Sequence, residues 1–370
     1  MKKFLMGAVG ASVMALSAGA ASALDKVTVA YFLEWPTANQ VAQLDKVYDE
    51  EMGVEVDWRA FGNGNEMTQA MVSGDVQIAY SQGFVPFVVG VTNGAPLKLV
   101  GVAVTYAEND NCIVREDAGI TKENASELEG KRVATPIGNV THYKLLRTLD
   151  HLGVDASKVN LVQMNPPDGA VALARGDVTM ACGFGGALTR MREFGEPLMT
   201  GAEQEEIGIN TFDIVTVTED FAAEHPELIQ KFMDVTERAN QAYRDDNSAG
   251  LDKISKAAGM DKDATEAMLA NFGFPSAADQ KGENWLGGGI QEMTKGVADV
   301  MVDAGGLEKS LDSYDQFVDA SFLGGETMTD AGSGGSGGAK NAADMSEEEI
   351  VSELKAIQKR LDELLGALEN

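Results

Sequence analysis

Residues 138–146 read GNVTHYKLL and bring several polar groups to the start of a predicted amphipathic helix over about 141–152. Asn139 or Thr141 could cap that helix, because their side-chain oxygens accept hydrogen bonds from otherwise unpaired first-turn N–H groups. The same N–H groups, with the positive end of the helix dipole, could instead hold an anion. The stretch alone leaves both interpretations open, although caps are by far the commoner.

His142 in the same stretch could act as a general base if a nucleophile and an orienting partner lay beside it. The sequence contains no G-x-S-x-G motif and no recognisable Cys-His arrangement. Its three histidines are scattered, and no C-x-x-C or H-x-x-x-H spacing supports a zinc site. We therefore expect no enzyme, no catalytic residue, no cofactor and no bound metal.

The chain is strongly acidic, with 58 acidic against 29 basic residues and a net charge of −29. This balance argues against a nucleic-acid partner, because phosphates require a basic surface. The only cysteines, Cys112 and Cys182, could pair in an oxidising compartment. A chain of this length can also bury its core without a disulfide, so the pairing stays open.

Residues 1–23 are predicted to be a secretory signal peptide. Two lysines precede an apolar run, and the A-x-A-like sequence Ala21-Ser22-Ala23 ends the segment, so the mature chain is expected to begin at Leu24. No later segment approaches the ~20 apolar residues of a spanning helix. We expect a soluble exported protein, which in a bacterium is periplasmic.

Two segments of the chain look alike, MVSGDVQIAYSQG at 71–83 and LARGDVTMACGFG at 173–185. Each is typical of a helix end, a Gly-Asp turn, a short strand and a polar or glycine-rich loop. Alternating strands and helices predict βαβ units with parallel sheets and ligands at the carboxyl ends of strands. We expect two facing α/β lobes, with a cleft formed by the loops at 32–39, 81–84, 137–142 and 183–186.

These segments resemble the substrate-binding proteins of ABC importers for taurine and alkanesulfonates. The resemblance covers about residues 26–322 and is carried, in order, by VTVAY, VAQLDK, VEVDWRAF, SGDVQIAY, GKRVATPIGNVTHYKLLRTLDHLGV, ALARGDV and DFAAEHPELI. It implies a type II periplasmic binding protein fold, with two α/β lobes joined by hinge strands. It also implies a receptor that binds taurine and delivers it to an ABC permease. The alternatives are a receptor for another aminosulfonate or for an alkanesulfonate, and an enzyme on the same scaffold.

The resemblance implies a site for a sulfonate and for an ammonium two carbons away. Ser81 and Gln82 are expected at the start of the helix that follows the second strand. Backbone N–H groups at two helix starts would then point at the sulfonate. The residues expected on the other lobe are Asn139, Val140, Thr141 and His142.

For the ammonium, Asp213 in TFDIV is similar in position to the acidic residue of the taurine branch. Glu34 is a second candidate. A charge-assisted bond from an ammonium to a buried carboxylate contributes about 1.5 to 3 kcal/mol. Asp213 could instead be a hydrogen-bonded strand residue, and Glu34 a solvated loop carboxylate.

Trp35 and Phe184 could surround the ligand's methylenes and cation, because aromatic faces attract ammonium groups. Either ring could equally pack between the lobes. Phe184, followed by two glycines, departs from relatives that have tryptophan and proline there. Asn109 and Asn111, near the other hinge, are further candidate ligand contacts, whereas Tyr106 is read as a core or rim residue.

The C-terminal part lies outside the resemblance. Residues 324–343 have the composition of a flexible linker, and residues 344–370 show a heptad pattern typical of a coiled coil that forms trimers or tetramers. A helix docked on its own lobe is the alternative. The predicted organisation is a signal peptide at 1–23, lobe 1 at 24–107, lobe 2 at 108–213, a return to lobe 1 at 214–323, the linker at 324–343 and an oligomerisation helix at 344–370.

Overall fold

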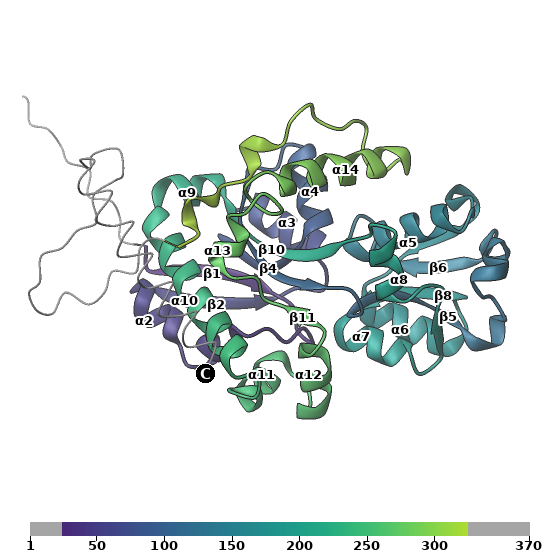
Figure 1. Cartoon of the computed structure of the whole chain (residues 1–370), viewed down its shortest axis with the longest axis horizontal. Coiled ribbons are helices and arrows are strands. Elements are labelled where there is room, and N and C mark those ends of the chain that lie inside the picture. Colours follow the sequence, from purple (N-terminus) through teal and green to yellow (C-terminus); the bar gives the residue numbers. More distant parts are fainter. Residues whose placement is uncertain (1–23, 325–370) are drawn as a thin grey trace, which may run out of the picture. The chain divides into compact units, whose positions relative to one another are not determined.

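The computed structural model describes residues 24–324, which form two α/β lobes, each built around its own sheet (Figure 1). The predicted signal peptide and coiled coil lie outside the described residues. So does all of the predicted linker except its first residue.

The sheet of the first lobe has six strands, and its central strands are buried on both faces. Strand β1 runs parallel to β2 and β3, whereas β10 runs antiparallel to both β3 and β4. The sheet is therefore mixed, which corrects the expectation of a purely parallel sheet. In spatial order the strands are β11 (Phe272–Gly273), β4 (Leu97–Tyr106), β10 (Thr211–Thr218), β3 (Ile78–Gly83), β1 (Lys26–Tyr31) and β2 (Glu55–Ala60).

The sheet of the second lobe has five strands and is also mixed. Strand β6 is parallel to β7 and β8, while β5 is antiparallel to β8 and β9. In spatial order the strands are β7 (Asn160–Gln163), β6 (Arg132–Thr135), β8 (Met180–Phe184), β5 (Asp110–Arg115) and β9 (Gly195–Pro197).

The chain crosses between the lobes twice within the described residues. The first crossing joins β4 to β5 through residues 107–109, and the second returns the chain to β10. The predicted end of lobe 2 at residue 213 falls inside β10, which belongs to the first sheet. Asp213 is therefore a first-lobe residue, because its whole strand pairs with β3 and β4.

Helices cover both sheets. The second-lobe helices are α5 (Val140–His151), α6 (Pro166–Arg175), α7 (Gly185–Met191) and α8 (Gly201–Glu206). The first-lobe helices are α1 (Gln40–Leu44), α2 (Val47–Met52), α3 (Gly64–Val72), α4 (Phe84–Thr92), α9 (Glu219–Glu224), α10 (Pro226–Asp245), α11 (Leu251–Ala258), α12 (Lys262–Leu269), α13 (Ala277–Gln280) and α14 (Gly289–Asp303).

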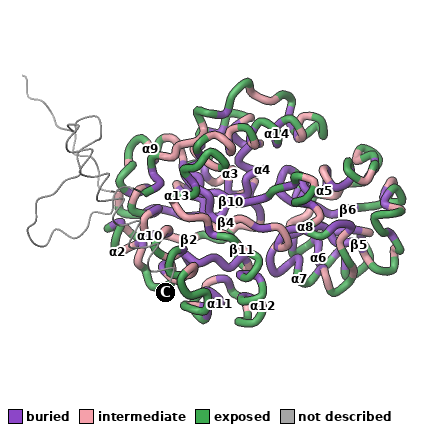
Figure 2. Tube along the Cα trace, viewed as in Figure 1, coloured by how far each residue is buried: buried purple, intermediate pink, exposed green. Residues whose placement is uncertain are grey.

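The buried residues gather on the strands and on the helix faces that cover them (Figure 2). In the second lobe, successive residues of β5 alternate between two cores: Cys112 and Val114 pack toward α5, and Ile113 packs toward α6 and α7. This alternation follows from the two-residue period of a strand. Within residues 24–324, every helix is too short or too polar to span a bilayer.

Candidate ligand-binding site

A cavity lies between the lobes, where strand ends and helix starts meet. It is bounded by the segment after β1, by the starts of α4 and α5, and by residues of β4, β5, β8 and β10. The lining residues are Phe32, Trp35, Gly83, Tyr106, Asp110, Asn139, Val140, Phe184 and Asp213.

Asp213 is buried in the cavity wall, and both of its carboxylate oxygens accept hydrogen bonds. Ser81 Oγ donates to Oδ2 and the Tyr106 hydroxyl donates to Oδ1, each at 2.7 Å. Trp35 Nε1–H in turn donates to Ser81 Oγ at 3.2 Å. Burial raises the pKa of Asp213 to about 7, while these hydrogen bonds act in the opposite direction. The carboxylate is therefore held in one orientation and is available to a cation.

Asp110 is a second buried carboxyl group in the same wall, and only 1% of the residue is exposed. Its Oδ1 has no hydrogen-bond partner among residues 24–324. Lys144 Nζ donates to the backbone oxygens of Ala107, at 2.8 Å, and of Asp110 itself. Burial raises the pKa of Asp110 to about 8; the Lys144 charge lowers it and the Asp213 charge raises it.

Sequence reasoning missed Asp110 because it selected the residues on either side. Asn111 follows Asp110 in β5 and so points to the opposite face of the strand, whereas Asn109 lies in the turn before β5. In the structure Asn109 Nδ2 donates to the Met268 oxygen at 2.9 Å, and Asn111 Nδ2 donates to the Met199 oxygen at 3.0 Å. Both asparagines hold backbone segments together, and neither lines the cavity.

The start of α5 presents N–H groups toward the cavity. Asn139 is the N-cap residue, but its Oδ1 accepts from Gly64 N–H at the start of α3, at 3.0 Å, instead of capping α5. Its Nδ2 is buried and has no partner in the described part of the chain. The first-turn N–H groups of Val140, Thr141 and His142 are therefore left without a side-chain cap and can donate to a ligand.

The start of α4 lies beside that of α5, but it already faces a carboxylate. A Cβ on Gly83, the N-cap of α4, would stand 2.9 Å from Val140 Cγ2 and 3.7 Å from Asp213 Oδ1. Glycine at this position allows the two helix starts to approach each other. The positive end of the α4 dipole favours the Asp213 carboxylate, which leaves the start of α5 as the better place for a ligand anion.

The side chains of Thr141 and His142 lie buried next to the cavity wall, and only their backbone belongs to the exposed helix start. His142 Nδ1 accepts from Gly138 N–H at 3.1 Å. Burial lowers the pKa of His142 to about 4, so the ring is neutral near pH 7 and carries its proton on Nε2. Within residues 24–324, neither His142 Nε2 nor Thr141 Oγ1 has a partner.

Ser81 and Gln82 lie near the end of strand β3, and α4 begins only at Phe84. The expectation that these two residues start a helix is therefore wrong. Ser81 reaches the site only through Asp213. Gln82 Nε2 donates to Thr68 Oγ1 at 2.7 Å, and its Oε1 accepts from the Thr216 hydroxyl. Gln82 thus joins elements within the first lobe and does not line the cavity.

Glu34 lies outside the cavity because its carboxylate is engaged elsewhere. Arg190 of the second lobe donates to both Glu34 oxygens, at 2.8 and 2.9 Å. The Glu34 backbone oxygen accepts from Gly186 N–H at 3.1 Å, and a Cβ on Gly185 would stand 2.3 Å from that oxygen. The two glycines therefore allow the lobes to approach, and Glu34 is a lobe-to-lobe contact that does not line this cavity.

Four aromatic rings line the cavity, two of which were not predicted to do so. The ring centre of Trp35 lies 5.0 Å from that of Tyr106 and 5.7 Å from that of Phe184, and both pairs are edge-to-face. The ring centres of Phe32 and Phe184 lie 5.2 Å apart. Tyr106, read from the sequence as core or rim, contacts both the cavity and Asp213. The rings exclude water and can pack against short methylene groups.

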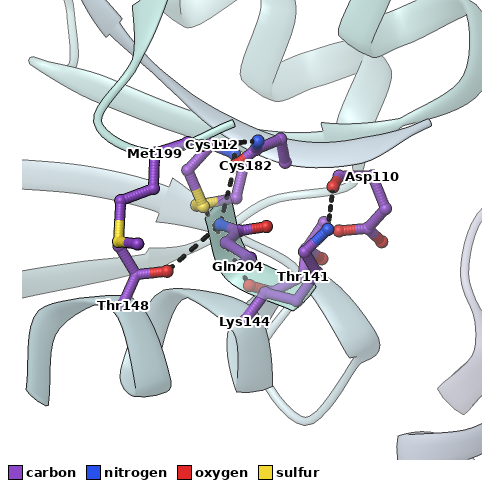
Figure 3. Close-up of a disulfide and its surroundings, with 9 residues drawn as sticks. Asp110, Cys112, Thr141, Lys144, Thr148, Cys182, Met199 and Gln204 are labelled. Atoms are coloured by element: carbon purple, nitrogen blue, oxygen red, sulfur yellow. Dashed lines mark hydrogen bonds between the residues drawn. A yellow bond between two sulfur atoms is a disulfide. The ribbon is translucent and has the colours of Figure 1, made fainter. Parts of the chain in front are cut away.

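Cys112 and Cys182, whose pairing the sequence left open, form a disulfide between β5 and β8 (Figure 3). The two residues are directly opposite each other in the antiparallel ladder, two positions from the cavity residues Asp110 and Phe184. Those two are themselves paired at the end of the same ladder. The disulfide therefore fixes the strand pair that presents them to the cavity.

The fold and sequence are similar to those of known proteins. The "Taurine-binding periplasmic protein" of Escherichia coli (strain K12) is 28% identical over 303 residues, which cover 80% of this chain and 92% of that protein. The structure of the alkanesulfonate-binding protein SsuA from Xanthomonas axonopodis pv. citri, bound to MOPS, has a TM-score of 0.64 at 18% identity. The match covers 78% of this chain and 96% of the other.

An enzyme shares the same fold. The desulfurization enzyme DSZB matches with a TM-score of 0.57 at 18% identity, over 81% of this chain and 98% of the other. The described lobes thus have the two-lobe α/β fold of periplasmic binding proteins. The family model described as NMT1/THI5 like matches residues 38–249, more than half of the chain. The chain therefore belongs to the NMT1/THI5-like family.

Proposed function

We propose that this protein is a periplasmic receptor that binds taurine between its lobes and delivers it to an ABC permease. The observation that carries the proposal is the composition of one cavity, which combines buried carboxyl groups with the uncapped start of α5. Taurine has one ammonium and one sulfonate, separated by two carbons, and so matches both features. The similarity to the taurine-binding protein of Escherichia coli supports this choice.

We name the two parts of the wall for what they offer a ligand. The carboxylate subsite consists of Asp213 and Asp110, and the amide subsite consists of Asn139 and the first-turn N–H groups that begin at Val140. The amide subsite would hold the sulfonate through N–H donors and the helix dipole. The carboxylate subsite would hold the ammonium, and Trp35 would pack against the methylenes.

The composition of the cavity favours an aminosulfonate over a simple alkanesulfonate. An alkanesulfonate would leave the Asp213 and Asp110 carboxyl groups buried without a cation, which costs free energy. An enzyme on the same scaffold is the second alternative, because the desulfurization enzyme DSZB has this fold. Both cysteines of the chain are joined in the disulfide and so offer no thiolate nucleophile.

Isothermal titration calorimetry of the mature chain with taurine and with ethanesulfonate tests the proposal. We expect taurine to bind with micromolar or tighter affinity, about −8 kcal/mol, and ethanesulfonate to bind at least about tenfold more weakly. Taurine recovered after prolonged incubation should be chemically unchanged by NMR. No heat with any aminoalkyl sulfonic acid would rule out the receptor assignment, and a new product would favour the enzyme.

Two further parts of the proposal concern segments outside the described residues. Export should remove residues 1–23, so mass spectrometry of the periplasmic protein is expected to place the first residue at Leu24. Residues 344–370 should assemble the receptor into trimers or tetramers and so raise its local concentration. Light scattering should give a multiple of the monomer mass, reduced to one copy when 344–370 are deleted; an unchanged mass would reject the coiled coil.

A further inference from the structure

Asp110 is the one carboxyl group in the cavity wall whose burial is not explained by protein hydrogen bonds. Asp213 receives a hydroxyl donor on each oxygen, from Ser81 and from Tyr106. Asp110 Oδ1, equally buried, has no partner among residues 24–324. A buried carboxylate without a donor is unfavourable, which is why burial raises the pKa of Asp110, and a cationic donor in the cavity would stabilise the charged form.

Lys144 does not supply that donor. Its ammonium group donates to the backbone oxygens of Ala107 and Asp110. Figure 3 shows the second of these two bonds. Lys144 therefore offers a nearby positive charge and fixes the backbone of Asp110, but it leaves the buried Oδ1 atom of this cavity-lining residue without a donor.

The two carboxyl groups come from different lobes. Asp213 belongs to β10 of the first sheet, and Asp110 is the first residue of β5 in the second sheet. Like charges brought together in a water-poor cavity repel each other, and a cation between them removes the repulsion. A ligand ammonium placed there would bond to both lobes at once.

We propose that Asp110 is a specificity-determining residue, which accepts an N–H hydrogen bond from the ligand's ammonium across from Asp213. The inference rests on the proposed function and extends it, because it defines the class of cation. The ammonium must keep at least one N–H for Asp110, so primary amines are preferred and fully N-methylated amines are rejected. The aromatic rings alone would predict the opposite preference, since they attract methylated ammonium groups.

The experiment compares wild type, Asp110→Asn and Asp117→Asn by calorimetry with taurine, ethanesulfonate and N,N,N-trimethyltaurine. Asp117 is an exposed second-lobe carboxylate paired with Arg115, so its variant controls for the loss of one negative charge. We expect Asp110→Asn to weaken taurine binding at least tenfold and ethanesulfonate binding less than threefold, and Asp117→Asn to change neither. Wild type should bind N,N,N-trimethyltaurine at least tenfold more weakly than taurine.

The outcomes separate this inference from the proposed function. If wild type binds taurine tightly and Asp110→Asn binds it equally well, only the role of Asp110 is overturned. Equal wild-type affinities for taurine and N,N,N-trimethyltaurine also overturn it, and this comparison does not depend on the folding of any variant. Absence of taurine binding to wild type overturns the proposed function and this inference together.

Discussion

In the proposed receptor, the carboxylate subsite and the amide subsite would bind opposite charges, and they would do so with different chemistry. Asp110 and Asp213 carry titratable groups whose pKa burial raises to about 8 and about 7. The start of α5 offers N–H groups and a dipole, which do not titrate. The carboxylate subsite should therefore determine which sulfonate binds most tightly and how binding depends on pH. The amide subsite should bind the sulfonate group of every such ligand in the same way.

The largest effect is expected from Asp213→Asn, which removes the charge while keeping the size of the side chain. Taurine affinity should fall about 10- to 100-fold, the value of a charge-assisted hydrogen bond to a buried group. Ethanesulfonate has no ammonium, so its affinity should change less than about threefold. Calorimetry measures both affinities, and equal losses for the two ligands would show that Asp213 does not bind the ammonium.

Acidification is expected to have the next largest effect, and only on cationic ligands. A carboxyl group with a raised pKa binds a proton as the pH falls through that pKa, and the proton then competes with the ligand ammonium. Protonation of Asp213 alone should therefore lower taurine affinity by about tenfold between pH 8 and pH 6, and protonation of Asp110 should lower it further.

The other groups around the two carboxyl groups explain why ethanesulfonate should show little change. Ser81 and Tyr106 only donate hydrogen bonds to Asp213, Lys144 is bonded to backbone oxygens, and His142, with its pKa of about 4, remains neutral in this range. Calorimetry at pH 6, 7 and 8 with both ligands measures the difference. A parallel loss for both ligands would show that the pH dependence does not come from binding of the ammonium by the carboxylate subsite.

Asn139→Ala tests the amide subsite. It should lower the affinities for taurine and for ethanesulfonate equally, by about five- to tenfold. The variant removes an unpartnered Nδ2 donor and also the bond to Gly64 N–H across the lobes. Asn65→Ala is the matched control, because Asn65 Nδ2 bonds to the Ile137 oxygen across the lobes at 2.8 Å without lining the cavity. Similar losses in the two variants would show that Asn139 contributes through lobe contact alone.

The smallest change in affinity is expected from replacing the disulfide in a Cys112→Ala/Cys182→Ala variant. The bond closes a loop of 70 residues, so the free energy of unfolding should fall by about 2 to 4 kcal/mol. The β5–β8 ladder and the hydrogen bonds of Lys144 still position Asp110, so both ligands should lose less than about threefold in affinity. Denaturant unfolding and calorimetry measure the two quantities, and a selective loss of taurine binding would show that the disulfide positions Asp110.

Local patterns and the family resemblance predicted the two lobes, Asp213 and the GNVTHY loop, because strand-helix alternation and helix starts depend on residues close in sequence. The pairing of Glu34 with Arg190 could not be predicted, because Arg190 comes from the other lobe and is distant in sequence. Asp110 was missed because the strand's register, and therefore its inward face, is set by pairing with β8. Register also decides that Cys112 meets Cys182, which no spacing along the chain could show.

A crystal structure of the receptor with taurine tests the central claim most directly. We predict sulfonate oxygens within about 3 Å of the N–H groups at the start of α5, beginning at Val140, and the ammonium within about 3 Å of Asp213 and Asp110. A sulfonate directed at the two carboxyl groups, or taurine bound outside this cavity, would contradict the account.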